Sequence, residues 1–386
     1  MLKPVYLDYA ATTPVAPQVA AVMAECLTLE GNFANPASRS HVYGWQAEEA
    51  VETARDQIAE LINADAREVV WTSGATEANN LALKGAAEHY RAQHPKGGHI
   101  IVSAIEHKAV LDPATWLEAQ GFSVTRLAPS VDGIVSAASL TAALRGDTFL
   151  VSLMLVNNEL GCINPVAEFA NICKTHRCLL HVDAAQAAGK IPVDVKALGA
   201  DLLSLSAHKF YGPKGVGALY VRRAPEVNIV AQLHGGGHER GMRSGTLATH
   251  QCVGMGLAAQ LAATELEQDA VRIATLRDQL WQGLADLPGI KRNGSATSCV
   301  SGIINVAFSG CDGEMLLLSL RDLALSSGSA CNSATLSPSY VLKAIGLSNE
   351  DAQASLRFSL GRYSSAAEIE FAIDQVRTLV TKLHKS

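Results

Sequence analysis

Between about residues 45 and 260, short apolar runs alternate with segments of helical periodicity. The runs that predict strands are EVVWTSG, HIIVSAI, TFLVSLMLV, CLLHVDA, DLLSLSA and GALYV. One intervening segment, GWQAEEAVETARDQIAELI, places apolar residues on a single helical face: Ala47, Val51, Ala54, Ile58 and Leu61. Strands that are apolar throughout and alternate with helices are typical of a parallel sheet covered on both sides. The sequence therefore predicts an α/β fold with a mostly parallel sheet flanked by helices.

The pattern changes after about residue 260. A long amphipathic helix is expected at 257–287, and short strands are expected at GIINVAF and LRFSLGR. A final helix begins at a capping box formed by Ser365 and Glu368. These elements predict a smaller α+β domain. We expect a large domain at residues 15–260 and a small domain made of residues 1–14 and 261–386.

Charge and hydropathy exclude several classes of protein. The 386 residues carry a formal net charge of −6 and no polybasic run, so nucleic acid and anionic membranes are not expected as direct partners. The longest apolar run, TFLVSLMLV, is about half as long as a membrane helix requires. The start of the chain, MLKPVYLDYAATT, does not have the pattern of a signal peptide. We therefore expect a cytoplasmic protein.

The eight cysteines form no CxxC pair, which argues against a zinc site or a thioredoxin-type site. Most are expected to be small buried hydrophobic residues. Cys331 differs, because its surroundings, SSGSACNSATLSP, have the composition of an exposed loop. The histidines of HGGGHER, His234 and His238, have a zinc-like spacing. Three glycines separate them, each costing about 1 kcal/mol in a helix, so no metal site is expected.

Polar residues follow several of the predicted strands, and ligands of open parallel sheets bind at that edge. A helix is expected to begin after VVWTSG, and its free N–H groups can bind phosphate together with the Thr76 hydroxyl. A serine or threonine at the start of a helix is, however, more often only a cap. In CLLHVDAAQAAG, Asp183 comes just past the apolar run and Gln186 lies three residues further on; an acid at this place must be paired or must cap the helix that follows. His107 ends another run, and a single histidine is usually structural.

Lys209, in SLSAHKFYGPKG, completes this group of residues at one edge of the sheet. Nicotinamide enzymes do not need such a lysine, and metal enzymes would have more carboxylate or histidine ligands. Pyridoxal phosphate uses the whole set. The amine binds the aldehyde, the acid keeps the pyridine nitrogen protonated, and the helix start binds the phosphate.

With these residues, the sequence closely resembles the cysteine desulfurases of the IscS/NifS family, which are class-V aminotransferase-like enzymes of pyridoxal-phosphate fold type I. The resemblance spans nearly the whole chain. Its motifs are YLDYAATTP, NPASRSH, TSGATEANN, EHKAV, VNNELG, DAAQAAGK, SAHKFYGPKG, GGGHERGMRSGT, SSGSAC and RFSLGR.

The resemblance implies a role for each matching residue. Lys209 would bind the cofactor covalently, Asp183 would face the pyridine nitrogen, and Gln186 would approach the phenolic oxygen. His107 would stack on the ring and act as an acid or base. The remaining matches are phosphate contacts (Ala75, Thr76, Ser206 and His208), a phosphate contact supplied by the other subunit of a homodimer (Thr246), substrate-carboxylate ligands (Asn35, Asn158 and Arg357) and the nucleophile that becomes the persulfide (Cys331).

The implied reaction converts L-cysteine to L-alanine and passes the sulfur from Cys331 to an acceptor protein. The acceptor could serve iron–sulfur cluster assembly, tRNA thiolation or DNA phosphorothioation. Family members dedicated to iron–sulfur scaffolds often extend past the last helix, whereas this sequence stops soon after it, so the acceptor stays open. Two alternatives remain. One is a selenocysteine lyase or another aminotransferase-like enzyme with the same cofactor, and the other is a non-enzymatic sulfur carrier or cluster-binding protein.

Overall fold

The computed structural model describes residues 3–327 and 338–383. Its largest sheet has seven strands in the order β2-β8-β7-β6-β5-β3-β4. These strands are β2 (Val69–Thr72), β3 (His99–Ser103), β4 (Ser123–Leu127), β5 (Thr148–Met154), β6 (Leu179–Asp183), β7 (Leu202–Ser206) and β8 (Gly217–Val221). The strands from β4 to β7 pair in parallel, which confirms the mostly parallel sheet.

Strand β8 is the exception, because it pairs antiparallel with both β7 and β2. The sequence pattern did not distinguish it from the other apolar runs. Its direction follows from its connection: between β7 and β8 the chain has only the short 3₁₀ helix η2 (Ala207–Lys209). A parallel crossover needs a dozen or more residues, usually including a helix. The chain therefore turns back at once, and Lys209 lies in that turn.

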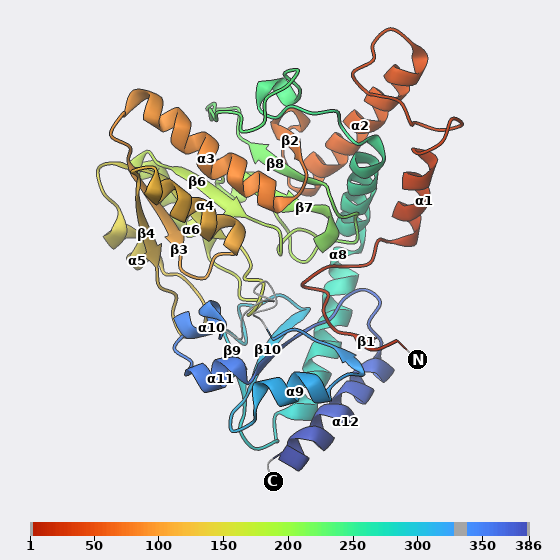
Figure 1. Cartoon of the computed structure of the whole chain (residues 1–386), viewed down its shortest axis with the longest axis vertical. Coiled ribbons are helices and arrows are strands. Elements are labelled where there is room, and N and C mark those ends of the chain that lie inside the picture. Colours follow the sequence, from red (N-terminus) through yellow and green to blue (C-terminus); the bar gives the residue numbers. More distant parts are fainter. Residues whose placement is uncertain (1–2, 328–337, 384–386) are drawn as a thin grey trace.

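Helices cover both faces of this sheet, as predicted (Figure 1). Successive residues of β3 enter different cores. Ile100 and Val102 pack with residues of α3 and α4, whereas Ile101 packs on the opposite face. The helices of this part are α1 (Pro17–Glu25), α2 (Val42–Leu61), α3 (Ala75–Gln93), α4 (Lys108–Ala119), α5 (Ala137–Ala143), α6 (Val166–His176) and α7 (Val195–Leu198). The short 3₁₀ helices are η1 (Ala66–Glu68) and η3 (Glu239–Gly241).

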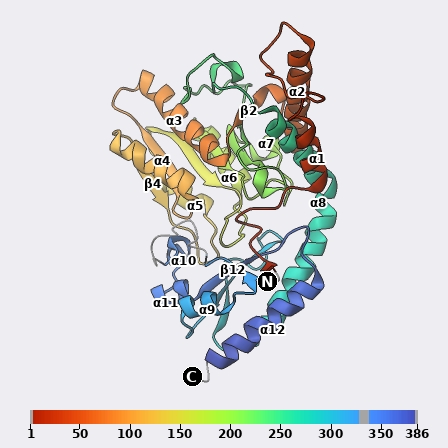
Figure 2. The ribbon, with the colours of Figure 1, turned by 45° about the vertical axis from the view of Figure 1, so that its right-hand side comes forward.

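Helix α8 (Thr249–Leu284) extends from the large sheet into the C-terminal part of the chain (Figures 1 and 2). It begins before the expected residue 257. Cys252 and Met255 near its start belong to the core beside the large sheet, whereas Leu276 and Leu280 belong to a second core. One helix thus packs into both cores. The predicted domain boundaries stay a prediction.

The second core lies beside a three-stranded antiparallel sheet in the order β12-β10-β9. The N-terminal strand pairs in parallel with a strand of this C-terminal part, so Leu7 is buried there. Ser365 and Glu368 form the predicted capping box before α12. The elements are β1 (Val5–Tyr6), β9 (Ile290–Asn293), β10 (Ile303–Phe308), β11 (Leu323–Ala324), β12 (Ser355–Ser359), α9 (Gly313–Ser319), α10 (Tyr340–Ala344), α11 (Asn349–Gln353) and α12 (Ala366–Leu383).

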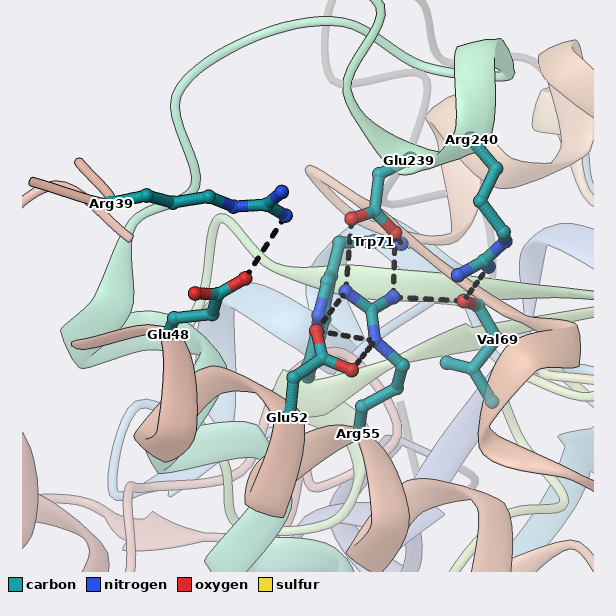
Figure 3. Close-up of polar contacts among 8 residues, drawn as sticks. All are labelled: Arg39, Glu48, Glu52, Arg55, Val69, Trp71, Glu239 and Arg240. Carbon is teal, nitrogen blue, oxygen red and sulfur yellow. Dashed lines mark hydrogen bonds and ion pairs between the residues drawn. The ribbon is translucent and has the colours of Figure 1, made fainter. Parts of the chain in front are cut away.

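Charged side chains close the outer edge of β2, the last strand of the large sheet (Figure 3). The Glu239 carboxylate accepts a hydrogen bond from the backbone N–H of Trp71 at 2.8 Å. The Arg55 guanidinium donates to the carbonyl of Val69 at 2.9 Å and lies 2.7 Å from Glu239. The ion pair therefore provides the acceptor and the donor that another strand would provide.

In the part of the chain that is described, no helix has both the length and the apolar character needed to cross a bilayer.

Candidate active site

A cavity of about 480 Å³ lies at the edge of the large sheet where β5, β6 and β7 end. The final residues of these strands, Met154, Asp183 and Ser206, all line it. Ten predicted site residues surround this one space: Ala75, Thr76, His107, Asn158, Asp183, Gln186, Ser206, His208, Lys209 and Arg357. Parallel strands bring their carboxyl ends to the same edge, so residues distant in sequence meet here.

Lys209 reaches the cavity from the turn that follows β7. Its Nζ donates hydrogen bonds to the carbonyl oxygens of Ala10 and Ala11, at 2.7 and 2.8 Å. The segment that carries these carbonyls is fixed in turn, because Thr13 donates its backbone N–H to the carbonyl of His208 at 2.9 Å. Backbone on two sides therefore holds the amine beside the cavity.

Asp183 is buried and hydrogen-bonded at the end of β6. Its Oδ2 accepts from the side-chain amide of Asn79 at 2.7 Å, and its Oδ1 accepts from the backbone N–H of Ala185 at 2.9 Å. Both oxygens thus have donors, which offsets the cost of removing the carboxylate from water. These contacts fix the Asp183 side chain in the lining of the cavity.

His107 caps the start of α4, where its Nδ1 accepts from the backbone N–H of Ala109 at 3.1 Å. Burial lowers the pKa of this imidazole, and the positive charge of Lys209 lowers it further, although Asp183 acts in the opposite direction. The neutral ring is therefore favoured. Because Nδ1 is the acceptor, the proton of the neutral ring is on Nε2.

The start of α3 has the features of an anion site. In the described structure no side chain caps this helix, whose first residues Ala75 and Thr76 line the cavity. Its N-cap is Gly74 at φ 149°, a conformation that residues with a Cβ rarely adopt. Burial lowers the pKa of nearby His208 to about 4, with Lys209 adding to the effect. Helix N–H groups with a positive dipole end favour a phosphate here.

Arg357 and Asn158 form the opposite wall. The Nη2 of Arg357 lies 2.7 Å from Asp8 Oδ1, and its Nη1 donates to the backbone carbonyl of Asn158 at 2.9 Å. Among the described residues, the Nε of Arg357 and the Oδ1 of Asn158 are buried without a hydrogen-bond partner. Buried polar atoms are normally satisfied, so this donor and this acceptor favour a polar ligand at the wall.

Three predicted site residues are not brought into this cavity. Asn35 and Thr246 are exposed and do not line the cavity of their own chain. The Asn35 side chain accepts from the backbone N–H of Ala37 at 2.9 Å. Cys331 lies outside the described residues. The roles inferred for these three residues stay predictions.

Sequence reasoning missed three polar residues of the site. Asn79 follows Ala75 by four positions, so the helical repeat places it on the same face of α3, and this signal was readable. Lys190 donates to the side-chain oxygen of Gln186, and burial lowers its pKa well below the usual value. Asp8 reaches Arg357 only through the folding of the N-terminal segment, for which no local signal exists.

The residues present fit pyridoxal phosphate. An amine lies beside a buried carboxylate, a neutral histidine and an uncapped helix start around one cavity. These groups suit the aldehyde, the pyridine nitrogen, the ring and the phosphate of that cofactor. In the described residues, no group of three or more His, Cys, Asp or Glu side chains could hold a metal ion.

Known proteins resemble this chain in sequence and in fold. Residues 5–371 match the family described as Aminotransferase class-V. The cysteine desulfurase IscS of Shewanella baltica strain OS223 is 57% identical over 385 residues, which is 100% of this chain and 95% of that protein. A solved NifS-like protein has a TM-score of 0.90 at 35% identity, covering 98% of this chain and 99% of its own. A structure titled SspA in complex with cysteine has a TM-score of 0.82 at 40% identity, covering 94% and 100%.

The fold and the site define a pyridoxal-phosphate-dependent enzyme. The chain belongs to the class-V aminotransferase family and, within it, to the cysteine desulfurases. The fold class, the cofactor and the family that the sequence predicted are therefore confirmed.

Proposed function

We propose that the residues around this cavity convert L-cysteine to L-alanine and that Cys331 receives the sulfur. The observation that carries the proposal is the arrangement around one cavity of the Lys209 amine, the buried Asp183 carboxylate and the uncapped start of α3. Pyridoxal phosphate, when bound, accepts the electrons left behind after a proton is removed from the α-carbon of the substrate. The protein must bind the substrate, move that proton and exchange the sulfur.

Lys209 moves the proton. Its Nζ is held by the carbonyls of Ala10 and Ala11 in the lining of the cavity, so it can take a proton from the substrate's α-carbon and return one later. Asp183, held by Asn79, would face the pyridine nitrogen of the bound cofactor and would keep it protonated. His107 is neutral with its proton on Nε2, so it can pack against an aromatic ring and donate that proton.

Arg357 binds the substrate carboxylate, because its planar fork matches a carboxylate bidentately. Its contacts with Asp8 and Asn158 fix the orientation of the guanidinium, and Nε with the second N–H of Nη2 supplies the two donors that a carboxylate needs. The buried Oδ1 of Asn158 offers an acceptor on the same wall. Asn35 is proposed to complete this subsite.

Sulfur transfer requires one bond exchange. The Cys331 thiolate attacks the sulfur of the substrate, a sulfur–sulfur bond forms and the carbon–sulfur bond breaks. The carbon accepts a proton and leaves as part of alanine, so one cysteine and one thiol give one alanine and one persulfide. The persulfide then passes to a thiol of an acceptor protein.

We infer a cytoplasmic homodimer in which Thr246 reaches the phosphate of the other subunit. Its exposure, outside the cavity of its own chain, supports this. Acceptors in iron–sulfur cluster assembly, tRNA thiolation and DNA phosphorothioation all fit the chemistry. The similar protein SspA is titled as a complex with cysteine, which supports cysteine as the substrate here.

The test incubates the purified enzyme with L-cysteine and measures alanine and sulfide. Lys209→Ala should release neither product. Cys331→Ala should still bind cysteine, seen as a change in cofactor absorbance, yet release little sulfide. Cys311→Ala, a substitution of another partly exposed cysteine, is the matched control and should retain full activity. Unchanged sulfide release by Cys331→Ala would reject the assigned nucleophile and favour a lyase that does not need this thiol.

A further inference from the structure

Cys162 and Cys299 face each other across an isolated antiparallel β-bridge. Two backbone hydrogen bonds, of 3.0 and 2.9 Å, join the residues that flank this pair on either side. The pair therefore occupies a non-hydrogen-bonded position of the ladder. At such positions the Cα atoms are about 4.5 Å apart and the side chains lie on the same face. Disulfides form between cysteines whose Cα atoms are roughly 4.4–6.8 Å apart, so this register allows one.

The two sulfur atoms have different surroundings. Cys299 is partly exposed, and its Sγ accepts a hydrogen bond from Arg292 Nη2 at 3.1 Å and lies 3.7 Å from Arg277 Nη1. Two guanidinium groups therefore contact the sulfur of this partly exposed side chain. Cys162 is buried and donates its S–H to the carbonyl of Asp132 at 3.0 Å. Burial raises the pKa of Cys162 to about 11, so it stays protonated.

We propose that Cys299 is a modification site for peroxides and that Cys162 is its resolving cysteine. The Cys299 thiolate attacks one oxygen of the peroxide, so a sulfur–oxygen bond forms, the oxygen–oxygen bond breaks and hydroxide leaves. The sulfur is oxidised to a sulfenic acid and the peroxide is reduced. The Cys162 thiol gives up its proton as its sulfur attacks the sulfenic sulfur, and the sulfur–oxygen bond of the sulfenic acid breaks. A disulfide forms, and the thiol proton leaves with the oxygen as water.

The crosslink would form beside the active site. A bridge between Val156 and Ile163 closes a turn, and this turn carries both Asn158 and Cys162. Cys299 lies in the segment before β10, in the C-terminal part of the chain. Oxidation would therefore tie the turn with Asn158 covalently to that segment. The inference stands on the geometry of this thiol pair and does not depend on the proposed function.

The test treats the full-length enzyme with hydrogen peroxide, blocks the remaining thiols, digests without reductant and maps the peptides by mass spectrometry. We expect one linked peptide pair, Cys162 with Cys299. Cys173 and Cys178 are both buried, and the Cys178 thiol donates to the backbone carbonyl of Cys173, so this pair should stay reduced and serve as the control. Reduced Cys162 and Cys299 after peroxide treatment, or a different linkage, would overturn the proposal.

Single substitutions separate the two steps. In Cys162→Ser, Cys299 should remain as a sulfenic acid that a dimedone probe traps. In Cys299→Ser, Cys162 should not react. Before oxidation, iodoacetamide should label Cys299 roughly tenfold faster than Cys311, because two guanidinium groups contact the Cys299 sulfur whereas burial raises the pKa of Cys311. Arg292→Gln should remove most of that difference. Equal labelling of the two cysteines in the unsubstituted enzyme would show that the arginines do not activate Cys299, and the proposal would fail.

Discussion

Removing the Glu239 carboxylate should destabilise the protein strongly, because this group is part of a buried ion pair. The side chains of Arg55 and Glu239 are 4% and 3% exposed, and two hydrogen bonds of 2.7 and 3.0 Å join them. The same carboxylate accepts from the backbone of Trp71. Glu239 and Arg240 also have left-handed backbones, at φ 49° and 55°, which cost roughly 1–2 kcal/mol each. The contacts of Glu239 hold this strained turn at the edge of β2.

The expected loss for Glu239→Ala is about 3–5 kcal/mol in the free energy of unfolding, the cost of leaving one charge of a buried pair. We expect a loss in the lower part of that range, because Arg55 retains two other partners in the variant. These are the Glu52 carboxylate at 3.0 Å and the carbonyl of Val69 at 2.9 Å. Glu52→Ala is the matched control. That carboxylate pairs with the same arginine but is 54% exposed, so its removal should cost less than about 1 kcal/mol.

Urea unfolding followed by tryptophan fluorescence measures both losses. Protein and cofactor concentrations must be equal in every sample, because association and ligand binding add to the apparent stability. The double variant Arg55→Met with Glu239→Leu should recover much of the loss, since an apolar pair of similar volume avoids the cost of burying charge. If Glu239→Ala and Glu52→Ala lose the same free energy within about 0.5 kcal/mol, the ion pair does not stabilise this edge.

Three further outcomes follow from individual contacts. Arg357→Lys should raise KM for cysteine roughly tenfold to a hundredfold with a smaller change in kcat, measured by steady-state alanine release, because lysine lacks the bidentate fork. Burial lowers the pKa of His181 to about 4. The free energy of unfolding should therefore fall by up to about 3 kcal/mol as the pH drops from 6.5 toward 4, because the unfolded state takes up a proton that the folded state does not. In urea titrations, His181→Gln should make the free energy of unfolding less dependent on pH in this range. Burial raises the pKa of Glu159 to about 7. The contribution of this group to the free energy of unfolding is therefore full below pH 4.5 and is lost as the pH rises through 7. In the same assay, Glu159→Gln should remove that loss. A pH profile unchanged by either substitution would contradict the assigned burial effect.

Local patterns predicted the elements whose signals are strong. The apolar face of α2 and the capping box of α12 follow from the spacing of side chains alone. The sequence pattern predicts the start of α8 too late, because Gly254 and Gly256 weaken the helical signal there. Packing explains them: a Cβ at Gly256 would lie 2.6 Å from the Cβ of Ala54. Close contact between α8 and α2 therefore requires the residue that local propensity disfavours.

The same limit applies to the site. Asp183, His107 and Lys209 could be proposed from sequence because each lies at or soon after the end of a strand, and parallel strands end at one edge. Arg357 lies on β12 of the other sheet, so only the resemblance to a family pointed to it. The contact between Asp8 and Arg357 joins the two ends of the chain, and no periodicity encodes such a contact.

That contact between the chain ends sets the geometry of the site. Ala10 accepts from the Lys209 amine, and its own N–H donates to Ser359 Oγ at 2.9 Å. Asp8, two residues earlier, holds Arg357, which lies two residues before Ser359 on β12. A short turn of N-terminal backbone thus binds both the amine proposed to move the substrate's α-proton and the guanidinium proposed to hold its carboxylate. Because this segment is also anchored through β1 to β11, the separation of the two groups is set by backbone pairing and not by the freedom of long side chains.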